Sequence, residues 1–303
     1  MRKIILLILT VSTIIIAQQR DSSIIFVSDT QAPMWIETLR LQEHDNEKAT
    51  KLIYRAIEQE STAVAAFHLG DITSIGMIDS YWSSFDEFHK HLRVPLYPVL
   101  GNHEYFFFKK PALEQFQKRF PTMSAMWYSV VLQSVAIIAL NSNFSQLTED
   151  ERFQQQTWYL EQLSKFESDT SINSVIVVCH HSPFTNSTIV DPSRGVQRYF
   201  VTPFSMYQKT AVFISGHAHS YEHFRKNGKE LLVIGGGGGL LQPLLIEREQ
   251  RYYDLYNQMN TMRFFHYIEC VVQQNSLQFF VKKLRNDFSG FDVADSVTVL
   301  TKK

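Results

Sequence analysis

Short hydrophobic runs alternate with amphipathic segments from about residue 22 to the end of the chain. The runs are rich in Val, Ile, Phe and Ala and end in polar residues or glycine, which predicts buried β-strands. They lie within residues 22–29, 62–71, 94–104, 130–143, 173–181, 210–219 and 230–239. Between them, residues 46–60 and 148–166 repeat their hydrophobic positions with a helical period. This alternation predicts the α/β class.

The same pass along the chain indicates a single domain. Residues 22–303 contain no internal repeat and no linker rich in Pro, Gly or Ser, apart from the glycine run 235–239. We therefore expect one catalytic-size domain over 22–303. Near its end, the runs 263–272 and 276–285 predict a hairpin, and the more polar segment 291–303 predicts an edge strand.

The first residues have the pattern of a secretory signal. Arg2 and Lys3 precede an uncharged apolar run, residues 4–16, which is short for a membrane-spanning helix. We expect a signal peptide over residues 1–17, cleaved after Ala17, and export to the periplasm or the outside of the cell. An uncleaved anchor is the alternative, because Ile15 is larger than the small residue that is usual at this position. Only in that case is a stable membrane attachment expected.

Composition and charge exclude partners that are selected by bulk charge. Of the 303 residues, 45% are hydrophobic and 19% are charged, which is enough to build a full core. Because the formal net charge is −1, there is no broad basic surface for nucleic acid and no polybasic membrane patch. Cys179 and Cys270 lie in apolar runs. An exported chain could join them by a disulfide, although nothing in the sequence sets their separation.

Polar residues that can bind a metal follow nearly every predicted strand. The carboxyl ends of neighbouring strands gather at one edge of an α/β sheet, so these residues should converge. Each has a structural explanation when taken alone: a Gly-Asp pair is usually a turn or a helix cap, and one of two adjacent histidines can belong to the core. Five such clusters in one chain are hard to obtain by accident. They are Asp29, Asp71, Asn102 with His103, His180 with His181, and His217 with His219.

The donor types of these residues indicate the metals and the chemistry. Carboxylate, amide and imidazole donors without thiolate suit ions such as Mn, Fe, Zn or Co, and they do not suit a structural zinc knot. So many donors indicate two ions. In two-metal sites the ions lie about 3.5–4 Å apart, a carboxylate bridges them and an acidified water is the nucleophile, which serves the hydrolysis of phosphate esters.

The order of these motifs resembles that of the calcineurin-like metallophosphoesterase superfamily, in its purple-acid-phosphatase-like branch. The resemblance covers almost the whole mature chain and its motifs are highly specific as a set. It implies a four-layer α/β/β/α sandwich with two mixed β-sheets and a dimetal centre at the strand ends. The motifs are Asp29, Gly70-Asp71, GNHE at 101–104, HHSPFTNS at 180–187, GHAHSYEH at 216–223 and the glycine run.

The resemblance also assigns the metal ligands and one catalytic residue. Asp71 would bridge the two ions. His103 would contact the phosphoryl group and protonate the leaving oxygen, with Glu104 orienting its ring. The remaining ligands would divide between the ions, with Asp29 and His219 on the first and Asn102, His180 and His217 on the second.

Two positions depart from the family pattern. Gln31 stands two residues after Asp29, where the family often has histidine, and it offers at most a neutral amide oxygen to a metal or a contact to substrate. Ser74 stands three residues after Asp71, where the purple enzymes have tyrosine. The first metal site therefore has fewer strong ligands than is usual for the family.

Two further alternatives concern the details of the site. His180 is favoured over His181 as the ligand because it directly ends its strand, which leaves His181 to face the substrate or to support the ligands. The glycine run 235–239 could approach a phosphate with its backbone amides. A strand-end loop packed beneath the site is the favoured role for this run.

These expectations lead to an exported, dimetal-dependent hydrolase that acts on a small phosphorylated substrate. A phosphomonoesterase is favoured through the motifs of the purple phosphatases. The first alternative is a phosphodiesterase or cyclic-nucleotide phosphodiesterase that uses the same site. A second alternative is a non-catalytic exported protein that binds metal or phosphate, and the intact His103 argues against it.

Overall fold

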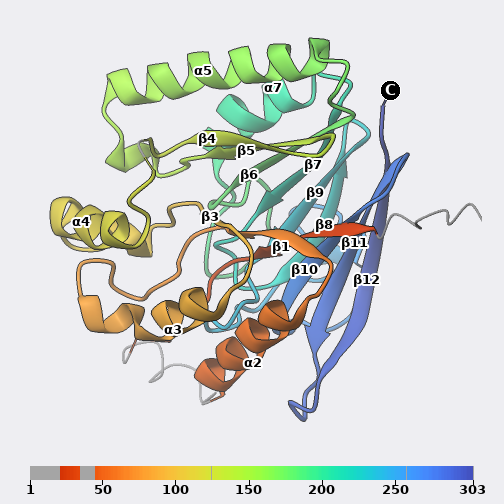
Figure 1. The fold of residues 1–303 in the computed structure, drawn as a ribbon. Helices are drawn as coiled ribbons and strands as arrows, with labels where there is room; N and C mark the ends of the chain where they lie inside the picture. Colours follow the sequence, from red (N-terminus) through yellow and green to blue (C-terminus); the bar gives the residue numbers. More distant parts are fainter. Residues whose placement is uncertain (1–20, 35–44, 124, 257, 303) are drawn as a thin grey trace, which may run out of the picture.

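The computed structural model describes residues 21–34, 45–123, 125–256 and 258–302, so the expected signal peptide lies outside the described residues. Two six-stranded sheets lie face to face, and helices cover the outer face of each (Figure 1). Each sheet contains both parallel and antiparallel strand pairs. The expected α/β/β/α sandwich with two mixed β-sheets is therefore confirmed.

The first sheet joins the start of the described chain to its end. Its strands, in spatial order, are β12 Phe291–Leu300, β11 Ser276–Leu284, β10 His266–Val272, β1 Ser22–Val27, β2 Ala63–His68 and β3 Leu96–Pro98. Strand β1 pairs parallel with β2 and antiparallel with β10. The expected hairpin is present as β10 and β11, and the expected edge strand is β12.

The second sheet is parallel at its centre. Its strands are β4 Tyr128–Leu132, β5 Val135–Leu140, β6 Ser174–Cys179, β7 Thr210–Ser215, β9 Lys229–Ile234 and β8 Tyr221–Lys226. The hydrophobic run 130–143 contains parts of two strands instead of one, because Gln133 takes a left-handed φ of 55° in a tight turn. The sequence does not reveal β8, since its polar residues look like part of the site.

Alternation along the strands divides the core into layers. In β1, Ile24 and Phe26 join the hydrophobic cluster between the sheets, which also contains Ile176 of β6. Ile25 and Val27 join the cluster under the outer helices. Burial of one such side chain contributes about 1.5–3 kcal/mol. Packing on both faces therefore holds the strand ends, and the loops that follow them, in place.

Helices form the two outer layers. The first sheet is covered by α2 Asn46–Gln59, α3 Ser83–His91 and α4 Lys109–Arg119, and the second by α5 Glu149–Ser168 and helical turns at 194–204. The two expected helices are confirmed as α2 and α5, and a capping box starts α5. No helix in the described part of the chain combines the length and apolar character that crossing a membrane requires.

The two cysteines lie in different layers of the molecule. Cys179 of β6 faces the helices, whereas Cys270 of β10 lies between the sheets. Both are buried and free. The alternative of a disulfide between them is therefore not realised.

Candidate dimetal centre

The residues expected at the site stand on loops after strands of both sheets. Asp29 and Asp71 follow β1 and β2 of the first sheet, while His180 and His217 follow β6 and β7 of the second. Asp29, Asp71 and His217 have left-handed φ angles of 59°, 51° and 68°. Such angles are uncommon for residues with a side chain and cost on the order of 1 kcal/mol each. Three of the eight non-glycine residues with a left-handed φ in the described part of the chain are therefore expected ligands.

Two groups of metal-binding atoms meet at these loops and share one carboxylate. Asp29, Asp71 and His219 form the first group, and Asp71, His180 and His217 form the second. Within each group the donor atoms lie within 4.8 Å of one another. A carboxylate that belongs to both groups is what a bridging ligand between two ions requires.

The second group gains a fourth donor from Asn102. His180 Nε2 lies 3.1 Å from Asn102 Oδ1, 3.2 Å from His217 Nδ1 and 3.3 Å from Asp71 Oδ2. Donors bound tetrahedrally at about 2.0–2.1 Å around one ion lie about 3.3 Å from each other. The distances from His180 are therefore those expected for donors that surround a single ion.

Backbone carbonyl groups hold two of the histidine rings. His180 Nδ1 lies 2.9 Å from the carbonyl oxygen of Leu69, and His219 Nδ1 lies 2.7 Å from that of Leu240. A ring nitrogen that faces a carbonyl carries the proton, which leaves Nε2 free to bind a metal. His219 Nε2 lies 3.4 Å from Asp29 Oδ1. Both rings are thus held in a tautomer suited to metal binding.

The two aspartates are buried carboxylates that require positive charge. Burial raises the pKa of Asp71, but the facing rings of His180 and His103 outweigh it and hold that pKa well below its usual range. Among the described residues, the ion-pair partners of Asp29 and Asp71 are histidines, with no lysine or arginine. A pair of divalent cations fits this donor set, because it would supply the missing charge.

Gln31 lies at the first group. Its Nε2 is 3.1 Å from His219 Nε2, and its Oε1 is buried without a hydrogen-bond partner in the described part of the structure. A carboxamide that rotates by 180° presents its oxygen where its nitrogen was. Gln31 can then offer a neutral oxygen beside Asp29, Asp71 and His219, which fits an ion in the first group.

His103 lies beside the shared carboxylate. Its backbone N–H donates to Asp71 Oδ1 at 2.9 Å, and its Nε2 is 3.9 Å from Asp71 Oδ2. Its Nδ1 is 2.7 Å from the carbonyl oxygen of Ser74, which orients the ring. The expectation that Glu104 orients this ring is therefore wrong, because a backbone carbonyl occupies that position.

Glu104 instead fastens two ligand loops to each other. Its carboxylate accepts hydrogen bonds from the backbone N–H groups of Gly101, Asp71 and Ile72 at 2.7, 2.8 and 2.7 Å. Burial and the charge of Asp71 raise the pKa of Glu104 to about 7. Sequence reasoning missed this role because the amides of Asp71 and Ile72 follow another strand, β2.

A cavity of about 270 Å³ adjoins the second group, and Asn102 and His181 are among its lining residues. His181 Nδ1 is 2.8 Å from Ser142 Oγ, and its ring centroid is 4.5 Å from that of His217. The structure thus places His180 among the donors and His181 at the cavity.

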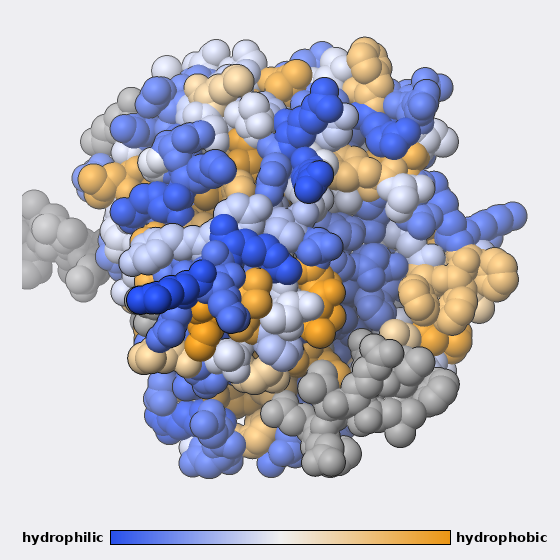
Figure 2. Space-filling view, turned by 180° about the vertical axis from the view of Figure 1, so that it is seen from behind, coloured by the Kyte–Doolittle hydropathy of each residue, from blue (hydrophilic) through white to orange (hydrophobic). Residues whose placement is uncertain are grey.

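On the face opposite to Figure 1, hydrophilic residues line a hollow with hydrophobic residues at its rim (Figure 2).

The glycine run 235–239 packs against the first group. The amides of Gly235, Gly237 and Gly239 donate to backbone carbonyl oxygens, including that of Asp29 at 2.7 Å, so these amides are not free for a phosphate. A Cβ atom at Gly239 would lie 2.9 Å from the His219 ring. The run therefore has the favoured role of a packed loop beneath the site.

Comparison with known structures places this geometry in context. The chain shares its fold with GAP50, the anchor in the inner membrane complex of Plasmodium (TM-score 0.67, 13% identity, 93% of this chain and 90% of that chain). It also resembles purple acid phosphatase PPD1 from yellow lupin, with a TM-score of 0.62, 17% identity and coverage of 93% of this chain and 54% of that chain. A dimetal phosphatase from Danio rerio is similar as well, with a TM-score of 0.62, 12% identity and coverage of 92% of this chain and 98% of that chain. The chain thus spans about half of the lupin enzyme. No curated protein sequence matches it significantly.

These likenesses show the fold, and a sequence match shows the family. The model of calcineurin-like phosphoesterases matches residues 22–221, which include every strand-end cluster described above. The match ends at Tyr221, two residues after the last donor of the first group, His219. The chain therefore belongs to the calcineurin-like phosphoesterase family, which indicates a metal-dependent hydrolase of phosphate esters.

Proposed function

We propose that this protein is an exported phosphomonoesterase that works with two metal ions. The observation that carries the proposal is the position of Asp71 in both groups of donors. When bound, two ions such as Mn, Fe, Zn or Co would neutralise phosphoryl oxygens and acidify a water molecule. The first ion would be held by Asp29, Asp71, His219 and Gln31, and the second by Asp71, Asn102, His180 and His217.

Other residues of the chain would position the ester and supply a proton. His181 lines the cavity beside the second group, where its ring can donate a hydrogen bond to a phosphoryl oxygen. His103 is held at Nδ1 by the Ser74 carbonyl, so its Nε2 faces the shared carboxylate. From there, His103 would transfer a proton to the leaving oxygen as a general acid.

Two features support the finer parts of the proposal. The purple-phosphatase-like motifs and the fold shared with the lupin enzyme favour a monoester over a diester as substrate. Arg2, Lys3 and the apolar run that follows them support export. The ordered position of His103 beside Asp71 favours catalysis over a role in binding alone.

The direct test is turnover by the mature protein, residues 18–303. We expect metal-loaded protein to hydrolyse p-nitrophenyl phosphate faster than bis-p-nitrophenyl phosphate. A chelator should abolish the activity, and Mn, Fe, Zn or Co should restore it. If protein shown by metal analysis to carry two ions hydrolysed no ester of either class, the non-catalytic alternative would replace this proposal.

A further inference from the structure

A short aromatic segment borders the proposed centre. Phe106, Phe107 and Phe108 follow His103 closely in sequence and lie just before α4. Phe107 and Phe108 are 66% and 64% exposed. Hydrophobic residues also protrude beside the hollow on the side of the molecule where α4 lies (Figure 2). Contiguous exposed aromatic side chains at the edge of an active site usually mark a binding surface.

The rings of Phe106 and Phe107 meet at an angle beside His103, the proposed proton donor, and we call this pair the Phe106–Phe107 corner. The Phe106 ring stacks on the His103 imidazole, with centroids 5.6 Å apart and planes inclined by 17°. The Phe107 ring lies 4.5 Å from that of Phe106 at 66°. Phe107 also has a left-handed φ of 67°, which is an outlier for a bulky residue. Strain of this kind persists where the surrounding structure enforces it, and it clusters at ligand-binding sites.

The position of the corner defines what it can bind. If His103 protonates the leaving oxygen, as the proposed function requires, the group attached to that oxygen lies next to His103 and meets the corner. We infer that Phe106 and Phe107 bind the leaving group, and that the substrate is a phosphate ester whose alcohol carries a planar aromatic ring. Such a ring can stack on one phenyl group and meet the other edge to face, and both arrangements favour binding beyond the burial of apolar area.

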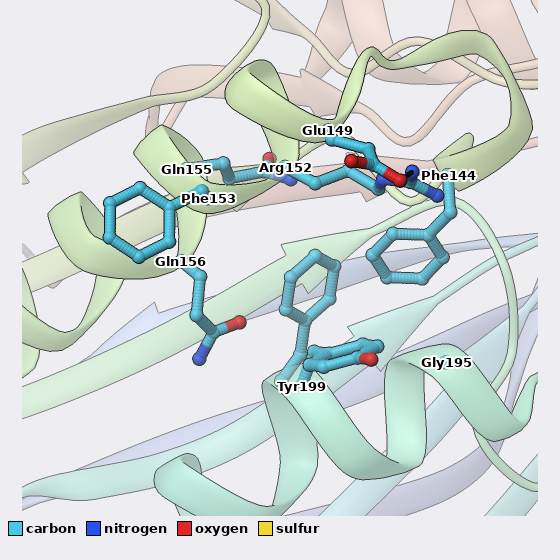
Figure 3. A pocket seen from close by; sticks show the side chains of 9 residues that line it. Phe144, Glu149, Arg152, Phe153, Gln155, Gln156, Gly195 and Tyr199 are labelled. Carbon is cyan, nitrogen blue, oxygen red and sulfur yellow. Dashed lines mark ion pairs between the residues drawn. The ribbon is translucent and has the colours of Figure 1, made fainter.

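A second aromatic pocket is the competing location. It has a volume of about 500 Å³, and its lining includes Phe144, Phe153, Tyr199 and Arg152 (Figure 3). None of the expected metal ligands and neither ring of the corner lines this pocket. It has one lining residue, Phe144, in common with the cavity beside the second group. The Phe106–Phe107 corner is favoured because it touches His103 directly.

The experiment compares esters with and without a planar aromatic ring in the leaving group. One pair is 2-phenylethyl phosphate with 2-cyclohexylethyl phosphate, and the other is adenosine 5′-phosphate with ribose 5-phosphate. The leaving alcohols of each pair have similar basicity, so the ratio of kcat/KM reports recognition. The variants are F107L, which loses the aromatic plane but keeps the same backbone strain, F107Y, which keeps the plane, and F153L, which alters the other pocket.

We expect wild-type protein to prefer the aromatic member of at least one pair. F107L should lower that preference by about two- to tenfold, while F107Y and F153L should retain it. Equal metal content in all variants would show that the centre is intact. The pair that responds distinguishes a simple aryl group from a nucleoside.

Three outcomes would contradict the inference, and they differ in meaning. Hydrolysis of both members of each pair at equal rates would overturn the inference and leave the phosphatase proposal intact. Loss of the preference in F153L, but not in F107L, would place the leaving group in the pocket of Figure 3. No hydrolysis of any ester by fully metallated protein would overturn the proposed function itself, and the inference with it.

Discussion

Asp71 and His103 are in contact, yet the structure gives them different surroundings. Asp71 is buried, belongs to both groups of donors and accepts the backbone N–H of His103. His103 belongs to neither group, and its ring is held by a carbonyl on one side and a phenyl ring on the other. At the scale of single residues, a bridging ligand and a proton donor should therefore respond differently to substitution.

Asp71→Asn should remove metal and activity together, because an amide cannot bridge two cations as a carboxylate does. His103→Ala should keep the metal and lower kcat by about 10²–10⁴, the usual contribution of a general acid or base. Metal analysis beside the kinetics of both variants checks this. Equal metal loss in the two variants would show that His103 is a ligand or supports one.

The departures at Gln31 and Ser74 predict how iron would behave. The Ser74 hydroxyl donates to the carbonyl oxygen of Ala32, and the Tyr105 hydroxyl is engaged by Asn141 and Met126. Because no phenolate is positioned at the centre within the described residues, iron-loaded protein should lack an intense visible band. Absorption spectroscopy tests this, and an intense band would mean that a tyrosine reaches the metal.

Replacement of Gln31 by His should strengthen the first group, because imidazole binds these metals better than a neutral amide does. We expect affinity for the more weakly bound ion to rise by about tenfold, or 1.4 kcal/mol. Gln31→Leu, which removes the donor, is the matched control and should weaken binding. Titration calorimetry of metal-depleted protein measures both. Unchanged affinity in the two variants would place Gln31 outside the coordination sphere.

At the scale of strands and loops, much of the centre could be predicted because strands buried on both faces appear as continuous apolar runs. The polar residue after each run then marks a loop at the sheet edge. Contacts between residues that are far apart in the sequence could not be predicted. Glu104 is adjacent to His103 in sequence, but its carboxylate binds amides after β2. Strand β8 could not be predicted because its sequence is partly polar, and its pairing with β9 decides its structure.

Gly216, directly after β7, shows how closely the loops approach each other. A Cβ atom there would lie 2.0 Å from Ser28 Oγ and 2.4 Å from Asp29 Oδ2. Gly216→Ala should therefore displace Asp29, lower the free energy of unfolding by about 1–3 kcal/mol and weaken metal binding. The control is Gly228→Ala, where φ is 73° but no atom lies within 4 Å. The free energy of unfolding of this control should fall by about 1 kcal/mol, and the variant should keep its metal. Equal metal loss in Gly216→Ala and Gly228→Ala would contradict this explanation.

At the scale of the whole molecule, a polar link joins the sheets away from the centre. Nε2 of His223, in β8, lies 2.9 Å from Glu230 Oε2, and its Nδ1 lies 3.5 Å from Asp295 Oδ2. Asp295 belongs to β12 of the other sheet. Burial lowers the pKa of His223, but Asp295 and Glu230 outweigh it and raise this pKa to about 9. A raised pKa means that the charged ring stabilises the fold below about pH 6.5 and loses this effect as the pH rises through about 9.

His223→Gln should thus lower the free energy of unfolding by about 1–3 kcal/mol at pH 6, and the difference from wild type should shrink toward pH 10. Denaturant unfolding of metal-depleted proteins at both pH values measures this difference. His91→Gln is the control, because His91 is exposed beside Glu87 and should change the free energy by less than about 0.5 kcal/mol. A His223→Gln effect that is equal at both pH values would exclude the ionic link.

Each of the two donor groups takes residues from both sheets. Asp29 and Asp71 come from the first sheet, and His180, His217 and His219 come from the second. An ion in either group would therefore cross-link the two halves of the sandwich, and saturation at a hundred times its dissociation constant would add about 2.7 kcal/mol of stability per site. Resistance to proteolysis would then depend on the concentration of metal ions around the protein. The lifetime of the folded protein and its catalytic activity would therefore increase or decrease together with that concentration.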